Sequence, residues 1–227
     1  MFIQSKGETG LETLITSGLL PEVPHFPEVQ DYGQLFNCLD VLTNEEHSFR
    51  TLVIDTLNGV ERLIHEEVCR RSFNNDWTDK GFMGYMRGYE VSLADVRKLL
   101  NALDELRAKR RMSVICLCHT KVKPFKNPEG PDYDRFQPDM HEKTWGLCHK
   151  WADGVLFLNY ETFVTESGPT KKVKATGGQT RIMFTERHAA YDAKNRMGLP
   201  SEIEMGSNAQ ESWTNFINAL KSARKVD

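Results

Sequence analysis

The sequence lacks a long apolar run, a strong net charge and any repeated or low-complexity tract. Nothing in its 227 residues approaches the roughly 20 consecutive apolar residues of a membrane-spanning helix. The N-terminal MFIQSKGETG lacks the charged-then-apolar layout of a secretory signal. Because the formal net charge is −3, contact with nucleic acid would need a local basic patch rather than an overall positive field. These absences predict an ordinary soluble protein.

Paired cysteines are also lacking. The five cysteines are odd in number, and several lie in apolar segments, as buried reduced thiols do. We therefore expect a cytoplasmic protein rather than a secreted, disulfide-stabilised one. Cys116, Cys118 and His119 lie close together, but no second pair of ligands follows at a spacing that is typical of zinc sites.

Apolar strands alternate with amphipathic helices over the first 120 residues. Strands are expected at 1–4, 51–55 and 112–118, with a short helix near 10–17 and longer helices after Asp31, after residue 56 and from Ser92. This alternation predicts an α/β fold, with a mostly parallel sheet and helices on both of its faces.

The second half of the chain has a different pattern. Residues 121–137 are polar and contain proline, which predicts a long loop, and a helix is expected over 139–151. Short strands at 154–159, 162–165, 171–175 and 181–185 predict antiparallel hairpins that turn at residues 167–168 and 177–178. A final helix over about 210–223 completes a single compact domain.

Polar residues end two of the predicted parallel strands. Asp55 and Thr56 follow an apolar strand at its carboxyl end, where α/β sheets bind their ligands. In P-loop ATPases such an acid holds the magnesium ion that bridges the nucleotide phosphates. The alternative is that Asp55 caps the helix that follows it. His119 ends the next strand, either as a sensor of a terminal phosphate or attacking water, or as a histidine satisfied within its own loop.

Two groups of basic residues are candidates for contact with phosphate. Lys194 and Arg196 lie two residues apart before Gly198, so both charges can reach one anionic group, although a solvated basic turn is the alternative. The stretch 121–137 mixes basic and aromatic side chains, which suits stacking on bases and contact with a nucleic-acid backbone. Its candidate nucleic-acid-binding residues are Lys121, Lys123, Lys126 and Arg135, and three acids in the same stretch dilute the pattern.

In order and spacing, these segments resemble the phage nucleotide-binding family of single-strand-annealing ATPases, which are short RecA-like, AAA-type P-loop proteins. The resemblance runs along nearly the whole chain. It rests on Phe2-Ile3 followed by Gly10-Leu11, and on the segments Thr51–Leu57, Cys118–Lys121, Asp134–Pro138, Trp151–Asp153 and Ala193–Pro200.

The resemblance implies an ATP- and Mg²⁺-dependent phage recombination protein that acts on single-stranded DNA as a ring or filament of identical subunits. It makes Asp55 the acid that holds Mg²⁺ through water, with Thr56 beside it in the nucleotide site. It makes His119 the sensor-like residue. It makes Lys194 and Arg196 a finger that enters the nucleotide site of a neighbouring subunit.

Two features depart from the family's pattern. No Gly-x-x-x-x-Gly-Lys-Ser/Thr loop, whose amides and lysine hold the phosphates, occurs in the sequence. We therefore expect the chain to lack the N-terminal strand, this phosphate-binding loop and the first helix, and to be inactive by itself. The family's general-base glutamate follows the first strand, where the register offers Lys6. Glu8 fits after an insertion of two residues and keeps the local Glu-x-Gly-Leu pattern, so Glu8 is the candidate base.

Other function classes stay open on the sequence. A chain without the phosphate-binding loop could be a catalytically inactive RecA-like module that binds DNA or a partner. A metal-dependent nuclease would rest on scattered acids and histidines alone. Loss of a central strand would also expose apolar surface of the sheet, which predicts poor solubility or self-association.

Overall fold

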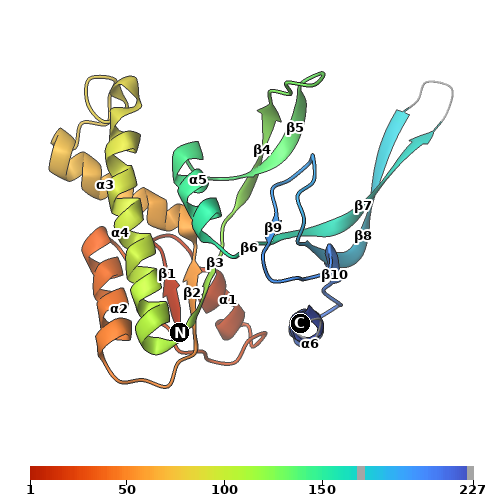
Figure 1. Ribbon diagram of the computed structural model, residues 1–227, viewed down its shortest axis with the longest axis horizontal. Coiled ribbons are helices and arrows are strands. Elements are labelled where there is room, and N and C mark those ends of the chain that lie inside the picture. Colours follow the sequence, from red (N-terminus) through yellow and green to blue (C-terminus); the bar gives the residue numbers. More distant parts are fainter. Residues whose placement is uncertain (168–171, 224–227) are drawn as a thin grey trace. The chain divides into compact units, whose positions relative to one another are not determined.

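The computed structural model describes residues 1–167 and 172–223 (Figure 1). It divides into two compact units, which are described separately. The first unit comprises Met1–Lys121 and Pro138–Trp151, and the second comprises Val122–Gln137 and Ala152–Asp227. Within the described part of the chain, no helix is both long and apolar enough to cross a membrane.

The first unit is built on a parallel sheet of three strands in the order β1-β2-β3. Its elements are β1 (Phe2–Gln4), α1 (Gly10–Thr16), α2 (Tyr32–Asn44), β2 (Thr51–Asp55), α3 (Leu57–Phe73), the 3₁₀ turn η1 (Gly84–Met86), α4 (Arg87–Arg110), β3 (Ser113–Cys116) and α5 (Glu142–Trp151). The predicted α/β class and the parallel pairing of these three strands are confirmed.

The sheet buries one face much more completely than the other. Ile3, Leu52 and Ile54 are fully buried and pack with apolar residues of α2, α3, α4 and α5 in one core. On the opposite face, Val53 pairs in register with Ile115. Ile115 remains 40% exposed and Leu117, just beyond β3, 42% exposed. Because parallel sheets are normally covered on both faces, this second face is an unusual apolar surface.

The two edges of the sheet also differ. Along β1, the amide of Phe2 donates to Pro24 (3.0 Å), and Phe26 and Val29 donate to carbonyls of β1 (3.0 and 2.9 Å). The segment 24–29 therefore closes the β1 edge. Among the described strands, β3 pairs only with β2, so its other edge is open.

Helix α2 begins as the sequence predicts, whereas α4 does not. The Asp31 carboxylate accepts the amide of Gln34 (2.8 Å) and caps α2. Helix α4 starts at Arg87, five residues before the expected Ser92. Ser92 does not cap a helix, because its buried hydroxyl donates to the carbonyl of Gly88 (2.8 Å) one turn earlier.

The second unit is mainly antiparallel. Its elements are β4 (Thr120–Phe125, which begins in the first unit), β5 (Tyr133–Pro138), β6 (Gly154–Val155), β7 (Phe157–Ser167), β8 (Lys172–Phe184), β9 (Lys194–Asn195), β10 (Glu202–Glu204) and α6 (Ala209–Ala223). Strands β10, β8 and β7 form one sheet, while β4 pairs with β5 and β6 with β9.

Two expectations for this unit are corrected. Residues 121–137 are mostly the β4–β5 hairpin rather than a loop, and the rings of Phe125 and Tyr133 lie 5.3 Å apart across it. Residues 177–178 do not turn, because β8 runs through them and a register shift between Tyr160 and Thr162 absorbs the irregularity. Of the turn expected at 167–168, Gly168 lies outside the described residues.

Candidate functional site

The carboxyl end of the parallel sheet gathers the residues that sequence analysis placed after its strands. β1 ends at Gln4, β2 at Asp55 and β3 at Cys116, and all three strands point the same way. Asp55 is the last residue of β2, and the segments that follow the three strands carry Glu8, Thr56 and His119. Ligands of α/β sheets bind at this end.

Glu8 lies at the centre of this group. The Thr56 hydroxyl donates to Glu8 Oε1 (2.9 Å), and His119 Nε2 lies 3.5 Å from the same oxygen. The Glu8 side chain is 24% exposed and that of His119 is 63% exposed, so the group is open to solvent on the His119 side. Lys6, which the uninterrupted register offered instead, lines a separate cavity of about 1020 Å³ that includes none of these groups.

Ser5 fixes the backbone that presents Asp55 and Thr56. Ser5 is fully buried; its amide donates to the Asp55 carbonyl (2.7 Å), and its hydroxyl accepts the Thr56 amide (3.1 Å). Gly59 packs so closely on Ser5 that a Cβ there would overlap the Ser5 side chain. The Asp55–Thr56 peptide bond is cis. Sequence analysis did not single out Ser5 or Gly59, because their importance depends on contacts between segments about 50 residues apart.

The structure excludes one of the two interpretations of Asp55, that it caps the helix after the second strand. Thr56, and not Asp55, is the N-cap of α3, since its side chain accepts the amide of Gly59 (3.2 Å). The capping alternative for Asp55 is therefore wrong. A Thr one residue before the helix is itself a common capping signal, and it was available in the sequence.

The backbone of His119 is held on both sides. Its amide donates to the Asn58 side-chain oxygen (3.1 Å), and its carbonyl accepts the amide of Asp139 (2.8 Å). Asn58 is a third residue, after Ser5 and Gly59, that sequence analysis missed. Its neighbour Leu57 donates to the Leu117 carbonyl (2.7 Å), so the start of α3 and the end of β3 are joined twice.

The carboxyl group of Asp55 lies close enough to Glu8 and His119 to be affected by their charges. Burial, and then the nearby charge of Glu8, raise the pKa of Asp55, whereas His119 acts in the opposite direction. The negative charge of Glu8 thus disfavours the ionised form of Asp55, and a cation beside Asp55 would favour it. Within the residues that the structure describes, no cluster of three or more His, Cys, Asp or Glu side chains forms a complete metal site. Magnesium commonly keeps several water ligands and needs only one or two carboxylates.

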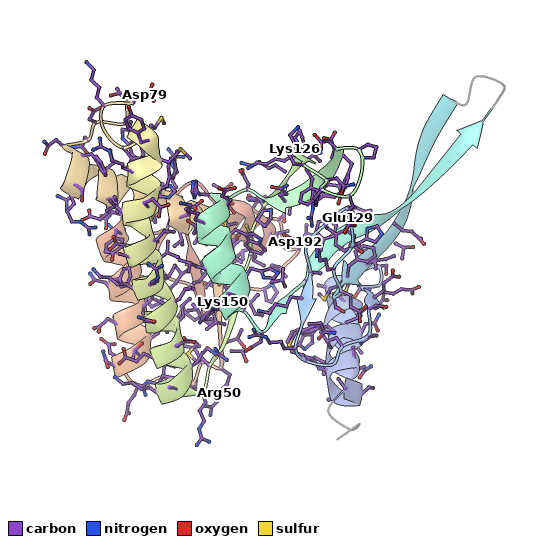
Figure 2. The ribbon with its side chains drawn as sticks, turned by 45° about the horizontal axis from the view of Figure 1, so that its top comes forward. Arg50, Asp79, Lys126, Glu129, Lys150 and Asp192 are labelled. Atoms are coloured by element: carbon purple, nitrogen blue, oxygen red, sulfur yellow. The ribbon has the colours of Figure 1, made fainter. Side chains whose placement is uncertain are left out.

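The basic residues of the β4–β5 region differ in availability. Lys121 pairs with Asp139, and Lys126 with Asp132 (2.5 Å), while Lys123 is half-buried. Figure 2 shows Lys126 and Glu129 at the turn of the hairpin. Arg135 is only 5% exposed, pairs with Asp192 (2.6 Å) and lies over the Phe125 ring (5.0 Å). This burial makes Arg135 part of the unit's interior packing and leaves it poorly placed to contact nucleic acid.

Lys194 and Arg196 belong to the second unit, on and just after β9. The Lys194 ammonium donates to the Ala152 carbonyl (2.5 Å). Arg196 is exposed, and its guanidinium lies 3.7 Å from Asp153. Asn195 braces the turn: its side-chain oxygen accepts the amides of Met197 (3.0 Å) and Leu199 (3.2 Å). The turn therefore presents Arg196 to solvent, while the Lys194 side chain is held by the carbonyl of Ala152.

Comparison with known proteins gives one match. A family model described as an AAA domain matches residues 21–197, which is more than half of the chain and includes parts of both units. The chain belongs to this AAA domain family. Such P-loop ATPases bind nucleotide and generally use Mg²⁺, so membership suggests a nucleotide-binding ATPase. No curated protein and no solved structure matches the chain.

Proposed function

We propose that this chain supplies the metal-binding and base-bearing part of an ATP-hydrolysing site at the carboxyl end of the β1-β2-β3 sheet. The protein would be a RecA-like ATPase that acts on single-stranded DNA in phage recombination. One observation carries this proposal: Thr56 and His119 both contact the same carboxylate oxygen of Glu8, beside Asp55. These residues lie at or just after the carboxyl ends of three parallel strands.

Each residue has a role that its geometry suits. Glu8 is the general base, because its carboxylate is partly exposed and oriented by two neighbours. Asp55 is the acid for Mg²⁺, which, when bound, would offset charge on the nucleotide phosphates. Thr56 orients Glu8, since its hydroxyl accepts from Gly59 and must donate toward the carboxylate. His119 senses the terminal phosphate or the attacking water from the open side.

The residues present fit the metal better than they fit the phosphates. Two adjacent carboxylate groups suit a cation, but the sequence has no phosphate-binding loop. We infer that this loop comes with a further strand that pairs with the open edge of β3, beside Ile115 and Leu117. The family match runs through both compact units, which supports treating them as parts of one ATPase domain.

The contact with a neighbouring subunit falls mainly to Arg196. The Lys194 ammonium already donates to the Ala152 carbonyl, whereas the Arg196 side chain is exposed, with its guanidinium 3.7 Å from the Asp153 carboxylate. A cation supplied in trans stabilises charge on the phosphoryl group that is transferred. On single-stranded DNA, Lys123 and Lys126 of the β4–β5 hairpin would contact phosphates, with Lys121 beside them.

Binding and hydrolysis of ATP test the nucleotide site. We expect weak or no Mg²⁺-dependent binding of a fluorescent ATP analogue by this chain, and clear binding once a segment with the phosphate-binding loop is joined upstream. In that longer protein, Glu8→Gln should lower turnover by roughly 10²–10⁴-fold with little change in ATP affinity. Glu12→Gln, an exposed acid on α1, is the matched control. An inert longer protein, or equal effects of both substitutions, would sink the assignment.

An inactive DNA- or partner-binding module is the second candidate. The absence of the phosphate-binding loop from the sequence favours it. It predicts that single-stranded DNA binds equally well with and without ATP, and that Asp55→Asn changes neither nucleotide binding nor DNA binding.

A further inference from the structure

Large exposed apolar side chains gather at the N-terminal end of α4. Within the described residues, five such side chains fall between positions 77 and 91: Trp77, Met83, Tyr85, Met86 and Val91. Tyr85 is 97% exposed, more than any other large apolar residue in the described part of the chain. We name residues 76–86 the Tyr85 loop. Figure 2 marks its position with Asp79. Exposed apolar groups concentrated in this way are typical of a binding surface.

The Tyr85 loop is fixed in place by Phe82. Phe82 is fully buried, with its ring centroid 4.8 Å from that of Trp77 and 5.0 Å from that of Tyr89. A Cβ at Gly88 would overlap the Phe82 ring. Two backbone hydrogen bonds complete the attachment. The amide of Phe82 donates to the Asp76 carbonyl (2.7 Å), and the amide of Gly88 donates to the Phe82 carbonyl (2.9 Å).

The exposed tip of the loop has an uncommon backbone. Tyr85 and Met86 are consecutive and both have positive φ, 49° and 61°. Left-handed backbone is uncommon for residues with large side chains, and it persists only where the surroundings impose it. The Arg87 guanidinium contributes to this, since it donates to the carbonyls of Gly84 (3.3 Å) and Lys80 (3.2 Å). The fold therefore holds the Tyr85 ring in solvent at a conformational cost.

The chemistry of the loop favours single-stranded nucleic acid as its partner. A tyrosine ring that touches almost nothing of its own chain offers its face to a base, and methionines on either side can wedge against the neighbouring bases. Lys80 and Arg87, the first residue of α4, balance Asp76 and Asp79, so the loop together with Arg87 has no formal net charge. Its contribution to binding should thus come from stacking rather than from phosphate neutralisation.

We propose that the Tyr85 loop is a base-stacking contact for single-stranded nucleic acid, with Tyr85 as the stacking residue and Met83 and Met86 beside it. This inference rests on the proposed action on single-stranded DNA, and it assigns part of that action to a loop separate from the β4–β5 hairpin. Stacking contacts are tolerant of sequence, because every base has an aromatic face.

Fluorescence anisotropy with a labelled oligothymidylate of about 20 nucleotides tests the proposal, with the whole chain as the protein. Tyr85→Ala should weaken binding by roughly 5- to 100-fold, the range expected for loss of one base–aromatic stack. Tyr85→Phe should bind like wild type, because the ring is kept. Leu19→Ala, which shortens a 73% exposed side chain elsewhere in the same unit, should also bind like wild type.

The salt dependence separates this contact from the basic hairpin. Tyr85→Ala should leave the slope of log Kd against log salt unchanged, while Lys123→Ala with Lys126→Ala should reduce it. Ultraviolet cross-linking should attach the oligonucleotide to the peptide that contains Tyr85. Thermal unfolding of Tyr85→Ala should match wild type, since the side chain is almost fully exposed.

The outcomes distinguish the two ideas. If Tyr85→Ala binds like wild type while the hairpin lysines matter, the Tyr85 loop is not a stacking contact and the proposed DNA-binding function stands. If the wild-type chain does not bind the oligonucleotide, both claims about nucleic acid fail, and the nucleotide site is judged by ATP binding alone. If Tyr85→Ala changes only the oligomer mass or the binding to phospholipid vesicles, the loop binds protein or lipid and the proposal is overturned.

Discussion

The two edges of the parallel sheet differ in whether their outer backbone groups are hydrogen-bonded. At β1, the segment 24–29 makes hydrogen bonds with the strand, and both Ile3 of the strand and Val29 of the segment are buried. At β3, the outer backbone groups face away from β2, and Ile115 and Leu117 are about two-fifths exposed. An open apolar edge is a site for pairing with another strand. The β1 edge is therefore paired on its outer side, whereas the β3 edge has no strand partner among the described residues.

Core substitutions should show the largest difference between the centre of the sheet and its open side. Ile54→Ala removes a fully buried side chain and should cost about 2–5 kcal/mol of unfolding free energy. Ile115→Ala, in the neighbouring strand, should cost less than about 1 kcal/mol, because the side chain is already 40% exposed. Urea denaturation measures both. Equal costs would mean that the Ile115 face is covered.

A charge on the open edge should reduce self-association of the chain. We expect wild type to associate as its concentration rises, and Ile115→Lys to need roughly tenfold higher concentration for the same degree of association. Analytical ultracentrifugation measures this. Leu19→Lys, at an exposed position away from the strands, is the control. A wild-type chain that stays monomeric at all concentrations would contradict the open-edge account.

Hydrogen exchange should distinguish the two edges residue by residue. The amides of Ser113 and Leu117 donate toward β2, to Arg50 (2.8 Å) and Ile54 (2.9 Å), so the alternate amides of Val114 and Cys116 face outward. These outward amides should exchange roughly 10- to 100-fold faster than those of Phe26 and Val29 at the closed edge. Similar protection at both edges would show that the β3 edge is occupied.

The smallest expected effect concerns Asp55, which lies between the two edges. Its pKa is raised in the folded protein, by burial first and then by Glu8. When folding raises the pKa of a carboxyl, the protein loses stability as the pH rises from the ordinary pKa, here 3.8, through the pKa in the folded state. Asp55→Asn should therefore melt slightly above wild type at pH 7, and this gap should close below about pH 3.8. A difference in melting temperature that widens in acid would contradict the predicted sign of the effect.

Much of the fold could be predicted because its signals are local. The apolar run at 51–55, the cap at Asp31 and the amphipathic pattern of α4 each depend on neighbouring residues. The β4–β5 hairpin was missed because its strands are polar and contain proline, so they lack the usual alternation. The start of α4 was placed too late because Ser92 resembles a cap, while its hydroxyl in fact bonds within the helix.

The sequence pointed to several candidate residues of the site but not to their geometry. Strand ends and a family resemblance identified Asp55 and His119, and a local pattern favoured Glu8 over Lys6. That Thr56 and His119 meet at one oxygen of Glu8 depends on the parallel register of three strands, and Ser5 and Asn58 act through the same long-range contacts. The burial of Arg135 likewise depends on Asp192, 57 residues away in the chain.

The central claim is that Asp55 and Glu8 form half of a nucleotide site whose other half joins at β3. Isothermal titration of Mg²⁺-ATP tests it most directly, with this chain, with the chain joined to an upstream strand and phosphate-binding loop, and with Asp55→Asn in that longer protein. The account predicts saturable binding only by the longer protein, weakened by Asp55→Asn and unaffected by Glu12→Gln. Binding that survives Asp55→Asn unchanged, or no binding by the longer protein, would contradict it.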